Sequence, residues 1–112
     1  METLTDADMV RRVLEYIHVA EAGEPLDADD QRITLEKLKD VVAEGRTRGL
    51  VYWSTDETPR DCVTAMEQIV GARVCGRFLR PEFEAFEQSG WRRLSQMVAE
   101  PYRDRPVRAS HI

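Results

Sequence analysis

Apolar residues first recur at helical spacing near the start of the chain. Thr5 is placed as an N-cap, and Asp8 follows three residues later in capping-box position. Gly23 and Pro25 supply stop signals further on. The apolar stripe between these signals has the i, i+3, i+4, i+7 spacing of an amphipathic helix, at Val10, Val13, Leu14 and Ile17. The pattern predicts a helix that begins after Thr5 and that Gly23 and Pro25 end.

The next helical region, from Asp27 onward, has an interrupted pattern. Asp27 and Asp30 again form a capping pair. Ile33 falls on roughly the opposite side of a helix from an apolar set that shares an arc of about 120°. That set comprises Leu35, Leu38, Val41 and Val42. Because one straight helix cannot bury both sides, we predict a short helix near 27–32, a turn around 33–34 and a helix over 34–47. This is a helix-turn-helix pattern.

The second half of the chain combines two predicted strands with two predicted helices. Residues 50–55 (LVYWST) are rich in strand formers, and residues 72–79 (ARVCGRFL) alternate. Between them, Thr58 and Pro59 open a helix predicted over 59–70, which Gly71 ends. A longer wing that contains strand is an alternative there. Pro81 begins a last helix, which Gly90 either bends or divides in two.

This order of elements predicts an α+β, mainly helical fold of the winged-helix type, with a small two- or three-stranded sheet. The chain has 112 residues, which is enough for one domain. We place that domain at 1–100. Residues 101–112 contain two prolines and no periodicity, and they are predicted to form a polar tail.

Composition favours a protein of the cytoplasm. No apolar run approaches the roughly 18 residues of a membrane span, and the acidic N-terminus lacks a signal-peptide pattern. Cys62 and Cys75 are therefore expected to be partly buried thiols, with a disulfide between them as the less favoured alternative. A zinc site would need four ligands, and only His18 and His111 are available at no recognised spacing. We predict no metal and no cofactor.

The sequence contains no motif that indicates catalysis. It lacks a phosphate-binding glycine loop and a nucleophile elbow, and the carboxylates of Glu84 and Glu87 are more typical of a solvated helix face. Arg73 and Arg77 flank Cys75 and could lower its pKa, but a half-buried strand cysteine is the more ordinary interpretation. The protein is predicted not to be an enzyme.

Charge is distributed unevenly around a net value of −5. Residues 1–45 hold five basic and twelve acidic side chains, whereas residues 46–112 hold eleven basic and nine acidic ones. On the helix predicted over 34–47, the face opposite the apolar stripe presents Glu36, Asp40 and Glu44. Three carboxylates in a row would repel DNA, so this acidic face is predicted to bind another protein.

Two further surfaces remain open as alternatives. A DNA-binding regulator would use an arginine wing composed of Arg46, Arg48, Arg73, Arg77 and Arg80. Tyr52 and Trp53 could add base stacking. A homodimer would use the last helix through Phe83, Phe86, Trp91 and Leu94, although the same residues could instead fill the core.

The segment Gly76–Leu94 (GRFLRPEFEAFEQSGWRRL) resembles the end of YjcQ-like small winged-helix proteins, in which a wing strand enters the last helix. It departs from that family at Arg80 and Pro81, where a threonine is expected, and at Phe83, where a glycine usually stands. In size and charge the chain is also similar in style to anti-CRISPR proteins encoded by phages and other mobile elements. These resemblances imply a winged-helix fold and, as the preferred function, an inhibitor or regulatory adaptor that binds a protein.

Overall fold

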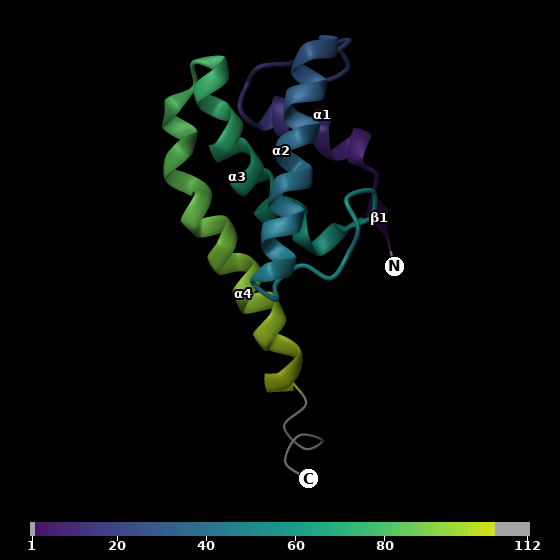
Figure 1. Ribbon diagram of the computed structural model, residues 1–112, viewed down its shortest axis with the longest axis vertical. Coiled ribbons are helices and arrows are strands. Elements are labelled where there is room, and N and C mark those ends of the chain that lie inside the picture. The colour runs from purple at the N-terminus through teal and green to yellow at the C-terminus, as the bar shows by residue number, and fades with distance from the viewer. Residues whose placement is uncertain (1, 105–112) are drawn as a thin grey trace.

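The computed structural model describes residues 2–104 of the chain, and their side chains over 2–98. Within this range the structure is mainly helical, with one small antiparallel sheet (Figure 1). The α-helices are α1 (Asp6–Tyr16), α2 (Ala28–Thr47), α3 (Val63–Val74) and α4 (Glu87–Asp104). The strands are β1 (Thr3–Leu4) and β2 (Thr58–Pro59), and the 3-10 helices are η1 (Arg60–Cys62), η2 (Cys75–Phe78) and η3 (Pro81–Phe86).

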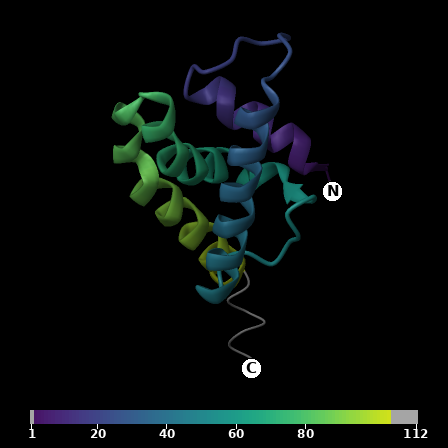
Figure 2. The same ribbon diagram turned by 45° about the horizontal axis from the view of Figure 1, so that its top comes forward.

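Helix α3 is the centre of the fold and packs against α1, α2 and α4. Two views show it enclosed by the other helices, with α2 running across its front and α4 beside it (Figures 1 and 2). Its sequence explains this position, because apolar or small residues occupy nearly all of its circumference rather than one stripe. Its buried residues are Val63, Ala65, Met66, Ile69, Val70, Gly71, Ala72 and Val74.

The prediction for α1 is confirmed at its start and wrong at its end. The Thr5 hydroxyl accepts a hydrogen bond from the Asp8 amide at 3.1 Å, as an N-cap should. The helix ends at Tyr16 rather than close to Gly23, because His18 adopts a left-handed conformation with φ of 62°. The chain then makes an irregular connection to α2.

Helix α2 is continuous over its 20 residues, so the predicted turn around 33–34 is wrong. Asp27 is the N-cap, and its carboxylate accepts from the amides of Asp29 and Asp30. Thr34 is fully buried, whereas Ile33 and Leu35 are only half-buried at the edges of the contact. The helix therefore need not bury both apolar sets, and the helix-turn-helix expected within this region is absent.

Neither of the two predicted strands forms. After α2, the amides of Leu50 and Val51 both donate to the carbonyl of Gly45, which folds residues 50–55 back against the helix end as an irregular segment. Residues 72–79 instead complete α3 and form η2. The observed sheet pairs Thr3 with Pro59 and Leu4 with Thr58. Among the described residues, the strands that would make a wing are therefore missing.

Gly71 explains why α3 passes the predicted stop. A Cβ at this position would come within 3.0 Å of the Tyr16 ring, so the glycine permits close packing of α1 rather than ending a helix. The predicted helix over 59–70 is confirmed in kind, but Thr58 belongs to β2 and is not its cap.

The last helical region is two elements, with the division between Phe86 and Glu87 rather than at Gly90. Gly90 packs on α3, where a Cβ would lie 2.6 Å from Ile69 and 2.7 Å from the carbonyl oxygen of Ala65. Helix α4 extends to Asp104, which is four residues into the segment predicted to be a polar tail. Its remaining residues, 105–112, lie outside the described range. None of the helices described is both long and apolar enough to cross a membrane.

Candidate functional site

Four charged side chains and one indole join α2, α3 and α4 in what we call the interhelical ion cluster. Arg73 on α3 bonds Glu44 at 2.7 Å and Glu87 at 2.8 Å. Arg48, the C-cap of α2, bonds the other oxygen of Glu44, and its Cζ lies 3.9 Å from the centroid of the Trp91 ring. Trp91 Nε1 donates to Glu87 at 3.1 Å. Each carboxylate therefore has at least two donors.

The electrostatics of this cluster favour its charged form. Hydrogen bonding from Arg73 lowers the pKa of Glu44. Burial raises the pKa of Glu87, but the bonds from Arg73 and Trp91 outweigh it and the net pKa is lowered. The two carboxylates in turn raise the pKa of Arg73. Two positive and two negative charges balance here, so the cluster stabilises helix packing and offers no excess charge to a ligand.

The predicted arginine wing does not converge on one surface. Arg48 and Arg73 belong to the interhelical ion cluster, Arg46 Nη2 donates to the carbonyl of Trp53 at 2.6 Å, and Arg80 Nη2 donates to that of His18 at 3.2 Å. Arg77 is exposed and lies close enough to the start of α2 for its charge to oppose, without reversing, the rise in the pKa of Asp30 that burial and the neighbouring aspartates cause. Most of these guanidinium groups are thus engaged within the chain.

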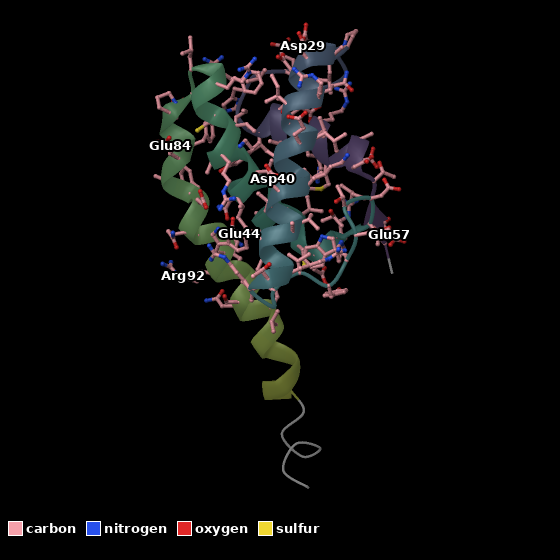
Figure 3. The ribbon with its side chains drawn as sticks, in the orientation of Figure 1. Asp29, Asp40, Glu44, Glu57, Glu84 and Arg92 are labelled. Atoms are coloured by element: carbon pink, nitrogen blue, oxygen red, sulfur yellow. The ribbon has the colours of Figure 1, made fainter. Side chains whose placement is uncertain are left out.

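The acidic face predicted on α2 is also partly neutralised. Glu44 is bound in the interhelical ion cluster, and Glu36 lies 3.4 Å from Arg32. Asp40 is exposed and has no ion pair within the described range. Figure 3 shows Asp40 on the front of α2, with Glu44 below it toward α4. The three residues therefore share a side of the helix but do not form a continuous acidic stripe.

A different concentration of negative charge lies where the α1–α2 connection enters α2, and we call it the acidic end. Its members are Glu21, Glu24, Asp27, Asp29 and Asp30. The ion pair described there is a long one of 3.8 Å between Asp29 and Arg32. Burial and repulsion from Asp27 and Asp29 raise the pKa of Asp30. The helix dipole accommodates the three aspartates. It does not account for the two glutamates.

The sequence predicted a helix cap in part of the acidic end, but the acidic end was not predicted as a binding surface. The signal was present in the run EAGEPLDADD, which contains five carboxylates and no basic residue. A capping role explained Asp27 and Asp30, so the remaining acids drew no separate interpretation. The structure places the run at one tip of the molecule, where Asp29 is seen at the top of α2 (Figure 3).

The residues predicted for a dimer contact divide between the core and the surface. Trp91 and Leu94 are buried, with 3% and 1% of their surface exposed, and they pack inside the chain. Phe83 is half-buried and Phe86 is 43% exposed. Of the four, Phe86 alone presents a large apolar surface to solvent.

The two cysteines are free and buried. Burial raises the pKa of Cys62 to about 11, and its Sγ contacts the sulfur of Met97. Burial also raises the pKa of Cys75, so the lowered value considered for a cysteine between two arginines is wrong. Cys75 lies at the end of α3, where Sγ is 3.3 Å from the carbonyl of Ala72. Both thiols are therefore protonated near neutral pH.

An open groove of about 400 Å³ runs between β1, α1 and the start of η1. Three arginines and three carboxylates line it, together with the strand residues, and the ion pairs near it measure 3.3–3.5 Å. This balanced lining provides no concentrated charge and no convergent catalytic group. Over residues 2–98, no cluster of three or more histidine, cysteine or acidic side chains is arranged to hold a metal ion.

No family model, no curated protein and no solved structure matches this chain. The fold and its surfaces define a small, mainly helical domain with a balanced charged cluster at one end of α2 and an unbalanced one at the other. Any role assigned to it depends on those surfaces.

Proposed function

We propose that the chain is a non-enzymatic binding protein that acts through protein–protein contact as an inhibitor or regulatory adaptor. The acidic end supports this proposal, because the basic side chains described near its five carboxylates are Arg32 and Arg77, which leave an excess of negative charge. Such a surface complements a basic patch on a partner and accelerates encounter with it. A protein that normally binds nucleic acid has a patch of this kind, and the anti-CRISPR-like role expected from size and charge would use it.

The alternative of a DNA-binding regulator has less support from the same geometry. Of its five predicted arginines, four bond to carboxylates or backbone carbonyls within the chain. A phosphate backbone is bound by converging cationic donors, which these residues do not provide together. The wing strands expected of a winged helix are also missing among the described residues.

The test compares charge reversal at the acidic end with charge reversal elsewhere. Full-length wild-type protein and the Glu21→Lys/Asp29→Lys variant are used to capture proteins from the natural host, and each captured protein is then purified and titrated. The control is Glu57→Lys/Asp61→Lys, which reverses two exposed carboxylates outside the acidic end. Figure 3 shows Glu57 well away from Asp29. We expect a salt-sensitive complex that the control retains and the acidic-end variant weakens at least about tenfold, or about 1.4 kcal/mol.

A second titration uses mixed-sequence duplex DNA at low and at moderate salt. The proposed function predicts no binding beyond weak background, since the net charge of −5 opposes it. Salt-sensitive DNA binding that disappears in Arg77→Ala would overturn the proposal in favour of the DNA-binding alternative. A protein complex whose affinity the acidic-end variant leaves unchanged would also overturn the assigned surface.

A further inference from the structure

Four aromatic rings form a continuous cluster at the surface, which we call the aromatic patch. The ring centroid of Phe83 lies 5.1 Å from that of Tyr16, 5.8 Å from that of His18 and 6.5 Å from that of Phe86. Tyr16 and Phe83 are half-buried, while His18 and Phe86 are exposed. The patch therefore joins the end of α1 to η3 and leaves part of its ring surface open to solvent.

Local structure explains why these rings come together outside the core. In a 3-10 helix, side chains at i and i+3 share an edge, so Phe83 and Phe86 line one edge of η3. No residue of η3 is buried. Tyr16 is held against α3 by the absence of a side chain at Gly71, and the left-handed conformation of His18 turns the chain just after it. The rings are thus fixed in position and remain accessible.

Three carboxylates lie on the elements that carry or support the aromatic patch. Glu82 and Glu84 occupy the other two edges of η3 and are exposed, and Glu84 is seen on the outer side of the molecule (Figure 3). Glu67 precedes Gly71 by one turn of α3. Burial raises the pKa of Tyr16, and the charge of Glu67 raises it further. Glu67 has only 17% of its side chain exposed, and the ion pair described for it is with Arg12 at 3.4 Å.

Exposed aromatic rings with carboxylates on neighbouring positions match the chemistry of a cation. A guanidinium over an aromatic face gains a cation–π attraction, and a nearby carboxylate adds a charge-assisted bond. The chain already uses this combination internally, where Arg48 lies over Trp91 and bonds Glu44. At the aromatic patch, by contrast, the faces of Phe83 and Phe86 have no guanidinium described over them.

We propose that the aromatic patch, with Glu67 near Tyr16 and Glu84 on the neighbouring edge of η3, is the docking site for an arginine side chain of the partner protein. This inference rests on the proposed function and names the contact that gives the complex its specificity. The acidic end attracts the basic surface over distance, and the aromatic patch holds one guanidinium of that surface by stacking. Such anchors contribute most of the affinity at many interfaces.

Arg80 provides a way to separate a cationic ligand from an anionic one. It lies beside the patch and donates to the carbonyl of His18, so its positive charge opposes an incoming arginine. Arg80→Gln should therefore strengthen the binding of a cationic probe by about twofold to fivefold, as expected for a partly screened exposed charge. If the patch instead received a phosphate or carboxylate, the same variant would weaken binding.

The direct test is an NMR titration of the full chain with acetyl-Gly-Arg-Gly-amide and with the same peptide containing citrulline. Citrulline has nearly the shape of arginine without its charge. The arginine peptide should shift the ring signals of Tyr16, Phe83 and Phe86 saturably, and the citrulline peptide should bind at least about tenfold more weakly. Phe86→Leu and Glu84→Gln should each weaken the binding of the arginine peptide. Tyr52→Leu changes an exposed aromatic residue outside the patch and should leave that binding unchanged.

Three outcomes would overturn this inference: equal shifts from the two peptides, shifts confined to Tyr52, or weaker arginine binding in Arg80→Gln. Affinity measurements with the captured partner then distinguish a failure of this inference from a failure of the proposed function. If Glu21→Lys/Asp29→Lys weakens the complex while Phe86→Leu leaves its affinity unchanged, the proposed function stands and the aromatic patch is not the anchor. If both weaken it and the fold of each variant is intact, both proposals are supported.

Discussion

The two ends of α2 differ in how their charged side chains are paired. At its C-terminal end, Glu44 and Arg48 enter the interhelical ion cluster, in which short bonds satisfy each charged group. At its N-terminal end, five carboxylates gather around one long ion pair of 3.8 Å. The same residue types therefore pair across helices at one end and leave an excess of negative charge at the other.

The comparison shows that the number of charges in a segment is a poor guide to the charge that the folded surface presents, and that the pairing of those charges is a better one. Glu44 belongs to the predicted acidic face, and Arg73 to the predicted arginine wing, yet the two side chains bond to each other at 2.7 Å. A side chain that is bonded within the chain must break its hydrogen bond or ion pair before it contacts a ligand. Breaking it costs about 1–3 kcal/mol, or more for a charged group. Unpaired groups do not have this cost.

The largest contrast is expected between an aromatic residue of the cluster and one of the aromatic patch. Trp91→Ala removes a buried indole and its contact with Arg48, so we expect a loss of about 3–5 kcal/mol in the free energy of unfolding. Phe86→Ala, at an exposed position, should cost less than about 1 kcal/mol. Urea denaturation of both variants, with unchanged slope, measures the difference. Comparable losses would show that η3 is part of the stabilising core.

A smaller effect is expected when the central cation of the cluster is removed. Arg73→Met leaves Glu44 and Glu87 facing each other at a half-buried site, and we expect it to destabilise the chain by about 2 kcal/mol. Arg77→Met, four residues away at an exposed position, serves as the control and should change the stability by less than about 0.5 kcal/mol. Adding Glu87→Gln to Arg73→Met should recover part of the loss, because it removes one unpaired charge. Strict additivity of the two changes would contradict a direct coupling.

The fold was predictable from sequence where apolar spacing and caps agreed. The caps at Thr5 and Asp27 and the helical character of residues 63–70 are confirmed. The strand predictions are wrong because short runs of strand formers can also be buried without pairing. Val51 and Trp53 enter the core, with Tyr52 exposed between them, from an irregular segment. Alternation alone does not distinguish that arrangement from a strand.

Tertiary packing accounts for the errors that concern glycine and long-range charge. Gly71 and Gly90 read as helix breaks, but both lie inside helices at close helix contacts. A single sequence does not reveal which helix lies opposite a glycine. The pairing of Arg73 with Glu44 and Glu87 joins residues far apart in the chain. The acidic end was visible in the sequence, since its residues are local, whereas the aromatic patch depends on α1 meeting η3.

A fall in pH should change the contributions of the two ends of α2 to the free energy of unfolding in opposite directions. Because the folded pKa of Glu87 is lowered, its stabilisation is complete above the unfolded value of about 4.3 and is lost as pH falls through the folded pKa. Glu87→Gln should therefore reduce the stability at pH 7 and flatten the loss of stability between about pH 5 and 3. Thermal denaturation across this range measures both. If Glu87→Gln loses stability with falling pH as the wild type does, the interhelical ion cluster does not determine the acid sensitivity of the fold.

The smallest predicted effect is an increase in stability from removing one carboxylate at the acidic end. The folded pKa of Asp30 is raised, so its charge is a penalty above that pKa, and the penalty disappears as pH falls through it. Asp30→Asn should stabilise the chain at pH 7 by less than about 0.5 kcal/mol, because solvent screens a surface charge, and the gain should vanish in acid. The bond from its backbone amide to Asp27 is retained. Since Glu87→Gln removes the same charge with the opposite result, the pair compares the two ends directly, and a loss of stability in Asp30→Asn would show that the acidic end is stabilising rather than reserved for a partner.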